Sequence, residues 1–289
     1  MPTLKSIRKR ITSVKNTQKV TKVMKMIAAA RLRKAQASAL GARSYTEHLR
    51  NLATSIAGRM QDNPDALLAQ PSELKVMEML VITSDRGLCG GFNTNLLRKM
   101  RDYWNDYASR GVQVRCTMIG RKGRDYSKNQ NLQLGNYLDD IYANLTLEHI
   151  TPAAEAAIDR FIEGESQQVV IVYNRFKTVL APDARIEQLL PLTLAATDET
   201  ATVVDYLYEP SKEAVFRQVM RRSLIMQVYQ ALLESVAAEM AARMTAMDSA
   251  TKNAKEMMER LTMQYNRARQ AFITKELMDI VNGTESIKK

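Results

Sequence analysis

The stretch Met240–Phe272 reads MAARMTAMDSATKNAKEMMERLTMQYNRARQAF. Its apolar and small residues follow one another in alternating steps of four and three, at Met240, Met244, Met247, Thr251, Ala254, Met258, Leu261, Tyr265, Ala268 and Phe272. This heptad repeat predicts a left-handed coiled coil rather than a helix on the surface of a globular body. Because Met, Ala and Thr replace the usual Leu and Ile, we expect a seam that packs closely but holds weakly.

The seam belongs to a longer predicted helix, Ser211–Val281, which contains no Gly and no Pro. Asn282 and Gly283 follow it, and Gly is the residue that most often ends a helix. A helix of about 70 residues is roughly 105 Å long, far longer than a small domain can enclose. The helix could be an ordinary long coiled coil or one that also offers surface to other proteins, and the spacing leaves both alternatives open.

The N-terminal segment is strongly basic. Residues 1–55 hold thirteen Lys and Arg residues against the single acid Glu47, in a chain whose formal net charge is +11. A partner of this segment should therefore be anionic, such as acidic loops of another protein, lipid headgroups or nucleic acid.

The same segment predicts one helix to about Ile56, roughly 80 Å long. Leu4, Ile7, Ile11 and Val14 open a heptad seam, after which the apolar pattern drifts, through Val20, Val23, Met24, Ile27 and Leu32. We expect this helix to lie antiparallel to the C-terminal one, with paired residue numbers summing to about 266. That register places Met24 beside Arg243 and leaves the last ~18 residues of the C-terminal helix unpaired.

The middle of the chain alternates short apolar runs with helical segments. The runs Met79–Thr83, Val114–Ile119, Val169–Tyr173 and Arg185–Leu190 predict strands, and Leu96–Ala108 and Thr151–Glu163 predict helices. The predicted fold class is α/β: a central open Rossmann-like domain with a long antiparallel two-helix coiled coil made from both termini. The predicted segments are 1–57 (first helix), 58–74 (connector), 75–208 (α/β domain), 209–283 (second helix) and 284–289 (tail).

The glycine-rich turn Ser84–Asn93 follows a strand and precedes a helix, as a phosphate-binding loop would. Its spacing is not G-x-G-x-x-G and no Gly-Lys-Ser/Thr follows, so a tight turn is the simpler interpretation. Neither histidine of the chain is placed as a base for Cys89, and Asp85 beside Arg86 indicates a local ion pair. We therefore predict no catalytic, cofactor-binding or metal-binding residues.

Other features bound the class of protein. No apolar run approaches the ~20 residues of a membrane span, and no secretory signal is evident. The two cysteines, Cys89 and Cys116, indicate a reducing compartment without a disulfide framework.

Several motifs, in order along nearly the whole chain, resemble the gamma subunit of the rotary F-type ATP synthase, bacterial type. They are Ile7–Arg10, Asn16–Lys22 with Met24, Ser84–Gly91, Ile119–Gly123, Gln188–Pro191, Tyr206–Pro210, Ala241–Met244, Tyr265–Ala271 and Ile273–Leu277. Each motif alone is modest, but their shared order is specific. The cysteine-containing insertion of the chloroplast form is missing, so a dithiol switch is not expected.

The resemblance implies a rotor shaft that couples ion flow through a membrane c-ring to ATP synthesis or hydrolysis at sites on beta subunits. It implies one copy per complex, no catalytic role and no cofactor, and as partners an alpha3beta3 hexamer, an epsilon subunit and the c-ring. The implied location is the cytoplasmic face of the bacterial plasma membrane, as a peripheral subunit. The coupling ion and ring size remain open.

The resemblance also assigns residues. Coupling contacts to the hexamer fall on Met24, Arg243, Arg269, Gln270 and Thr274. The tip of the shaft comprises Phe272, Ile273, Leu277 and Ile280. Foot contacts to epsilon and the c-ring fall on Arg31, Arg33 and Tyr206.

Two alternatives come from other classes. A basic coiled-coil protein could bind nucleic acid through the N-terminal helix, although Tyr45 is the only aromatic residue there for base stacking. A nucleotide-using α/β enzyme would need a base and a phosphate loop that the sequence does not offer.

Overall fold

The structure is a computed structural model of the whole chain. It describes residues 3–58, 66–68, 70–71, 73–130, 132, 134–140, 145–178, 181–192 and 208–287. The chain divides into two compact units, Ala29–Arg243 (the α/β unit) and Met1–Ala28 with Met244–Lys289 (the coiled-coil unit). Each unit is described by itself.

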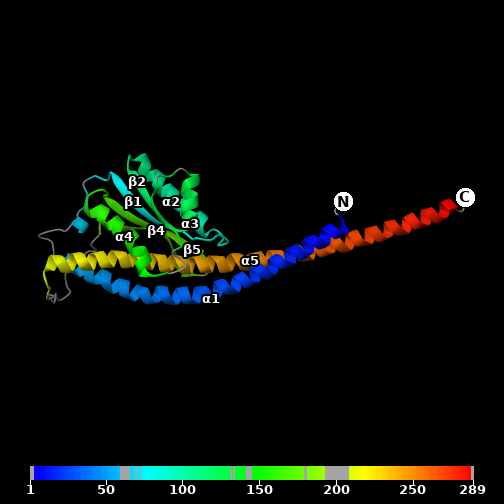
Figure 1. Cartoon of the computed structure of the whole chain (residues 1–289), viewed down its shortest axis with the longest axis horizontal. Helices are drawn as coiled ribbons and strands as arrows, with labels where there is room; N and C mark the ends of the chain where they lie inside the picture. The colour runs from blue at the N-terminus through cyan, green and yellow to red at the C-terminus, as the bar shows by residue number, and fades with distance from the viewer. Residues whose placement is uncertain are drawn as a thin grey trace. The chain divides into compact units, whose positions relative to one another are not determined.

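The α/β unit is built on a five-stranded sheet with the order β3-β2-β1-β4-β5 (Figure 1). Its strands are β1 (Val76–Ile82), β2 (Gln113–Ile119), β3 (Leu134–Leu138), β4 (Gln168–Thr178) and β5 (Ala181–Leu190). Strand β1 pairs in parallel with β2 and β4, with Met79 opposite Cys116 and Val170. Strand β5 runs antiparallel to β4. The predicted open α/β domain is confirmed, and β3 is a short strand that the sequence did not predict.

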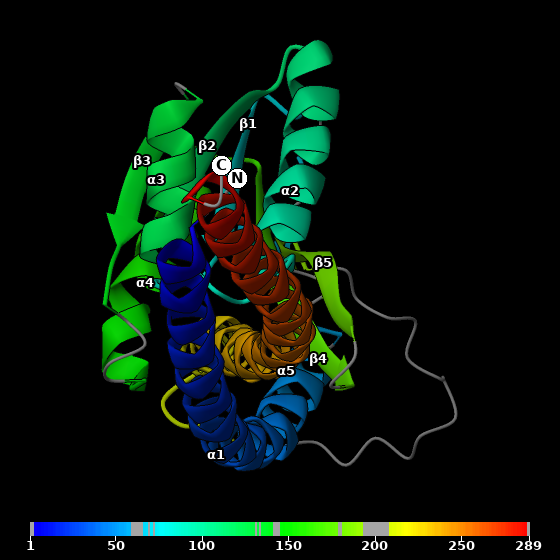
Figure 2. The same ribbon diagram turned by 90° about the vertical axis from the view of Figure 1, so that its right-hand side faces the viewer.

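Helices lie on both faces of the sheet (Figure 1 and Figure 2), and each face has its own hydrophobic core. Helix α2 (Phe92–Ser109) covers one face, where Leu96 and Met100 pack on Met79. The other face carries α4 (Leu147–Ile162) and parts of the two long helices, including Ile56 and Phe216. A 3-10 turn, Ala66–Leu68, joins this second core through the buried Leu67.

Two helices differ from the predictions. Helix α3 (Arg121–Asn129) lies in a stretch for which the sequence predicts no helix. Helix α4 begins at Leu147 rather than at Thr151, and Pro152 lies inside it. Pro152 removes one backbone hydrogen bond and crowds the preceding turn, and the burial of Ile150 offsets this cost and favours the additional N-terminal turn.

The long helices are α1 (Leu4–Ala57) and α5 (Lys212–Ile287). Helix α5 continues through Gly283, so the predicted end at Asn282 and Gly283 is wrong. Glycine permits a left-handed ending but does not impose one, and inside a helix it costs only about 1 kcal/mol relative to alanine. Most of the predicted connector and the tail's last two residues lie outside the described residues.

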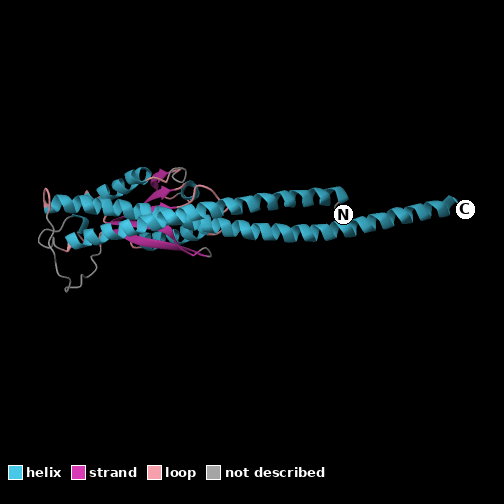
Figure 3. Ribbon diagram, turned by 90° about the horizontal axis from the view of Figure 1, so that it is seen from below, coloured by secondary structure: helices cyan, strands magenta, loops and turns pink. Residues whose placement is uncertain are grey.

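The coiled-coil unit contains the predicted seam. From Thr251 to Asn282, the residues of α5 that are not exposed are Thr251, Ala254, Met258, Leu261, Tyr265 and Ala268. The seam therefore ends at Ala268, one step before the predicted Phe272, which is 51% exposed. Figure 3 shows α5 running on beyond the N-terminal end of α1.

The drift predicted for α1 is wrong. Within the coiled-coil unit the heptad continues past Val14 through Gln18, Thr21, Lys25 and Ala28, none of which is exposed. Three of the apolar residues that suggested drift are largely exposed instead: Val20, Val23 and Ile27. Polar and small residues occupy the seam, so hydrophobicity alone does not reveal it.

The register also differs from the prediction. The hydroxyl groups of Thr21 and Thr251 lie 2.8 Å apart, and Lys25 Nζ donates to Asp248 Oδ1 at 2.6 Å. Thr21 is thus about six residues further along α5 than expected, and Met24 is level with about residue 248 rather than with Arg243. The predicted neighbourhood of Met24 and Arg243 is therefore wrong, because it was anchored on helix ends alone. The part of α5 that extends past the N-terminal end of α1 still measures about 18 residues, since α5 extends to Ile287.

Candidate functional site: the glycine-rich loop and helix α5

The loop Ser84–Gly91 connects β1 to α2 at the carboxyl edge of the sheet. The strand order reverses beside this loop, because β2 and β3 lie on one side of β1 and β4 lies on the other. In open α/β sheets, ligands bind in the crevice at such a switch point. The loop is therefore where a nucleotide-binding α/β protein would hold its ligand.

In this chain, helix α5 lies against that loop. Cys89 and Phe92 are buried in one cluster with Ala238, and Phe176 and Ala242 pack against the same cluster. Small side chains at Ala238 and Ala242 let the backbone of α5 approach the loop closely. The crevice is thus occupied by the chain's own helix, which agrees with the prediction of a tight turn and not of a phosphate loop.

Arg243 joins α5 to the loop by polar contacts. Its Nη2 donates to the carbonyl oxygens of Arg86 at 3.1 Å and Gly87 at 3.2 Å, and its Nη1 lies 2.6 Å from Glu239 Oε1. The Arg243 and Glu239 side chains are only 12% and 4% exposed. Burial raises the pKa of the Glu239 carboxyl, and the Arg243 charge acts in the opposite direction. The guanidinium is therefore engaged inside its own unit.

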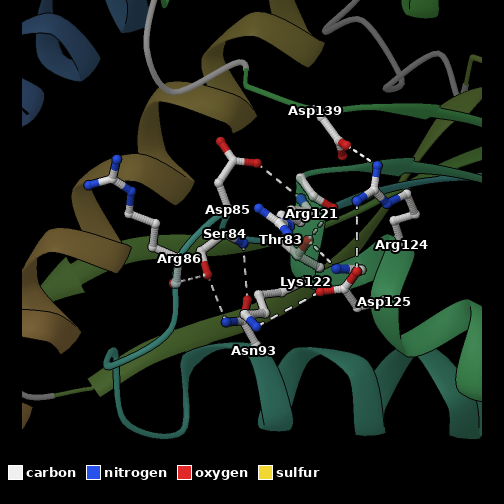
Figure 4. A network of polar contacts seen from close by, with 12 residues as sticks. Thr83, Ser84, Asp85, Arg86, Asn93, Arg121, Lys122, Arg124, Asp125 and Asp139 are labelled. Atoms are coloured by element: carbon white, nitrogen blue, oxygen red, sulfur yellow. Dashed lines mark hydrogen bonds and ion pairs between the residues drawn. The ribbon is translucent and has the colours of Figure 1, made fainter.

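The loop is also fastened to the domain (Figure 4). Asn93 Oδ1 accepts the backbone N–H of Ser84 at 3.0 Å, and Asn93 Nδ2 donates to Ser84 Oγ at 2.7 Å. Asp85 Oδ1 accepts the backbone N–H of Arg121 at 3.0 Å. The described residues show no ion pair between Asp85 and Arg86, so that prediction is wrong: the neighbouring turn supplies a better-placed donor.

A second glycine-containing segment, at the start of helix α3, supports the loop. Thr83 Oγ1 accepts the N–H of Gly123 at 2.8 Å. Gly120 has φ +104°, and a Cβ there would lie 2.3 Å from the carbonyl oxygen of Thr83, so only glycine fits. The motifs Ser84–Gly91 and Ile119–Gly123, far apart in sequence, form one polar network at the edge of the sheet.

The thiol in the loop is poorly suited to nucleophilic chemistry. Cys89 is 2% exposed and burial raises its pKa, so little thiolate forms at neutral pH. Its polar neighbours are the side chains of Ser84 and Asn93 and the carbonyl oxygen of Arg86, none of which is a base. The geometry favours a packing role for this side chain.

The other predicted site residues are spread over the chain. On α5, Arg269, Gln270 and Thr274 are exposed, and the Thr274 hydroxyl donates to the carbonyl oxygen of Gln270 at 3.0 Å. The four tip residues are also exposed: Phe272, Ile273, Leu277 and Ile280.

On α1, Arg31 and Arg33 are exposed and Met24 is half-buried. Tyr206 lies outside the described residues.

Sequence reasoning missed three buried glutamates. Glu78, on β1, pairs with Arg160, and Glu234 Oε1 accepts from Arg43 Nη2 at 2.9 Å. The third is Glu239. A signal was available, because each acid interrupts an otherwise apolar or small run, as in Val236-Ala237-Ala238-Glu239-Met240.

Two further properties concern the described residues. None of their helices is long and apolar enough to cross a membrane. They also contain no group of three His, Cys, Asp or Glu side chains arranged to hold a metal ion.

Comparisons with known proteins agree with this architecture. Residues 3–287 match a family model described as ATP synthase. The gamma chain of ATP synthase from Chlorobaculum parvum is 44% identical over 292 residues, and that from Anaeromyxobacter sp. (strain K) is 42% identical over 290, each covering 100% of both chains.

Solved structures share the fold. A chain of the central stalk and c-ring structure of the Tetrahymena thermophila mitochondrial ATP synthase is 24% identical, covers 80% of this chain and 99% of its own, and has a TM-score of 0.59. A chain of the Euglena gracilis OSCP/F1/c-ring structure has a TM-score of 0.66 at 17% identity, covering 98% and 94%. With full-length relatives above 40% identity and a matching coiled coil and α/β unit, the chain belongs to the family of ATP synthase gamma chains.

Proposed function

We propose that this chain is the central rotor shaft of an F1Fo ATP synthase, coupling ion flow through a membrane c-ring to ATP synthesis or hydrolysis on other subunits. The chain itself supplies no catalytic residue. Its work is to bias the conformations of distant sites, which requires different contacts in each rotary state.

The bare end of α5 carries this proposal. Every residue from Arg269 to Asn282 is exposed, including Phe272, Leu277 and Ile280. Large apolar side chains distributed around a lone helix favour burial against another protein. We therefore propose that this end sits in an apolar collar formed by an alpha3beta3 hexamer.

The charge of α1 supports the same role. A dense row of Lys and Arg residues on a helix is attracted to acidic loops without requiring one fixed fit, since exposed charges act through screened, long-range forces. The nucleic-acid alternative finds no support in the two relatives described above, which are both named as ATP synthase gamma chains.

The remaining partners and residues follow from the resemblance. Arg31, Arg33 and Tyr206 would face an epsilon subunit and the c-ring, and Met24, Arg269, Gln270 and Thr274 would make coupling contacts with the hexamer. The chain would be present once per complex, as a peripheral subunit on the cytoplasmic face of a bacterial plasma membrane.

Exchange of apolar side chains at the tip tests the proposal. In the double variant Ile273→Gln, Leu277→Gln, ATP-driven ion pumping by membrane vesicles should fall several-fold relative to ATP hydrolysis. The matched control, Lys275→Gln with Asp279→Asn, changes two exposed polar residues on the same turns and should pump normally. Normal pumping by the Gln variant would contradict an apolar collar.

A further inference from the structure

The Arg243 side chain engages three oxygen atoms of its own chain. Two are the consecutive carbonyl oxygens of Arg86 and Gly87, and the third is Oε1 of Glu239, one turn earlier on α5. An arginine offers five N–H donors in a rigid planar fork, so one guanidinium can hold both partners at once. Only 12% of this side chain is exposed, which leaves little of it for a contact outside the chain.

Within the loop segment that Arg243 holds, Ser84 Oγ also donates to the Arg86 carbonyl oxygen, at 2.8 Å, so Arg243 supplies the contacts that reach the segment from helix α5. Arg86, Gly87 and Leu88 are exposed, and Cys89 is the buried residue beneath them. Leu88 has φ +65°, a left-handed conformation that is unfavourable for a branched side chain, and it is 61% exposed. Such a conformation persists only where the surroundings impose it. The bonds from Arg243 to the two preceding carbonyl groups are a direct source of that constraint.

The position of Arg243 along α5 gives the contact a mechanical meaning. It is the residue at which the α/β unit ends on this helix. The loop on the other side of the contact is bonded to Asn93 of α2 and to the N-terminus of α3 through Arg121. A force carried along α5 therefore reaches two helices of the domain through this loop.

We propose that Arg243 is a positioning residue that braces the loop Ser84–Gly91 against α5 from within the chain. This contact keeps the thiol of Cys89 covered. It also transmits torque between helix α5 and the sheet domain that carries the loop. It replaces the external coupling contact that the family resemblance assigns to Arg243. The mechanical part rests on the proposed rotor function, whereas the covering of Cys89 does not.

Thiol accessibility tests the brace in the purified ATP synthase complex that carries the full chain. The rate of alkylation of Cys89 by N-ethylmaleimide is followed by mass spectrometry of its peptide, with the fully buried Cys116 as an internal control. Arg243→Ala should raise the Cys89 rate at least tenfold and leave Cys116 unchanged. Arg243→Lys, which retains a charged donor, should lie between the two.

Matched variants distinguish the loss of the Arg243 bonds to the loop from the effect of leaving the Glu239 carboxylate buried without its partner. The double variant Glu239→Gln, Arg243→Ala leaves no buried unpaired carboxylate, yet it should label as fast as Arg243→Ala. Glu239→Gln alone retains the bonds to the loop and should label like the parent chain, as should Arg260→Ala, an exposed arginine on the same helix. An unchanged Cys89 rate in the double variant would overturn the brace.

The mechanical part is measured as ions pumped per ATP hydrolysed in vesicles. The double variant should show a several-fold lower ratio while hydrolysis continues, and Arg243→Lys should recover part of it. If Cys89 becomes reactive and the ratio stays at the parent value, the brace exists but does not transmit force. Failure of the rotor function itself would instead abolish coupled pumping in the parent chain.

Discussion

Two stretches of helix α5 have opposite environments. Every residue from Ala231 to Ala241 is buried, including two glutamates, whereas every residue from Arg269 to Asn282 is exposed, including Phe272 and Leu277. The first stretch lies among the sheet, α1 and the glycine-rich loop of its own chain. The comparison shows that the apolar content of a helical stretch does not predict whether its own chain buries it. Under the proposed function, the second stretch resembles a core element because another protein covers it in the assembled complex.

The largest effect should come from the buried stretch. Leu232→Ala removes a fully buried side chain from the core between α5 and the sheet and should lower the free energy of unfolding by about 2–5 kcal/mol. Leu277→Ala makes the same change on the exposed stretch and should cost no more than about 0.5 kcal/mol in the free chain. Urea unfolding of the two variants gives the contrast, and equal losses would show that the stretches are not different.

A buried acid sharpens the comparison further. Glu234 is buried and accepts from Arg43, with Arg175 Nε at 3.7 Å. Arg43→Ala removes the closer partner and should lower the free energy of unfolding by about 1–3 kcal/mol, because the carboxylate stays buried with less compensation. Adding Glu234→Gln should recover part of this loss in the same urea experiment. No recovery would mean that the arginine stabilises the unit by packing alone.

Substitutions in the coiled-coil seam should have effects on stability between those of the buried and the exposed stretches. The Thr21 and Thr251 hydroxyl groups share a hydrogen bond across α1 and α5. Thr251→Ala should lower the free energy of unfolding by about 0.5–1.5 kcal/mol. Thr262→Ala is the matched control, since its exposed hydroxyl bonds only to the preceding turn at Met258. If the control costs as much as Thr251→Ala, the bond across the helices contributes nothing specific.

The smallest effect should depend on pH. Hydrogen bonds from Lys25 and then Lys252 hold the pKa of Asp248 below its ordinary value. A lowered pKa in the folded state contributes stability above the unfolded-state value and loses it as the pH falls through the folded-state value. The difference in Tm between the parent chain and Asp248→Asn should therefore be present at pH 7 and vanish well below about pH 4. Lys25→Met should remove the larger part of the same acid-sensitive component, and a difference that persists in acid would exclude this ion pair as its source.

The sequence predicted the elements whose periodicity is unbroken. The heptad from Met240 to Ala268, four of the strands and the α/β class follow from spacing and apolar runs. The seam of α1 escaped because Gln18, Thr21 and Lys25 occupy core positions, and β3 escaped because Leu134–Leu138 is short and lies at the sheet edge. Helix ends were poorly determined, and the register derived from them was wrong by about six residues.

The candidate site was found only in part. Glycines marked the loop Ser84–Gly91, but nothing local indicates that Ala238 and Ala242, some 150 residues away, fill the crevice beside it. The role of Arg243 inside the chain likewise arises from tertiary structure. Conversely, the side chains of Arg269, Gln270 and the tip are exposed, so the packing of this chain does not define their roles.

Rotation of the chain is the most direct test of its role as a shaft. A bead is attached through Gln130→Cys, an exposed position after α3, to the assembled hexamer complex held on a surface. Because Cys89 and Cys116 are buried, the new thiol is the one labelled on this chain, and the other subunits are used in cysteine-free form. We predict that ATP drives the bead round in one direction and that rotation stops when ATP is removed. Sustained ATP hydrolysis by complexes whose beads do not turn would contradict the account.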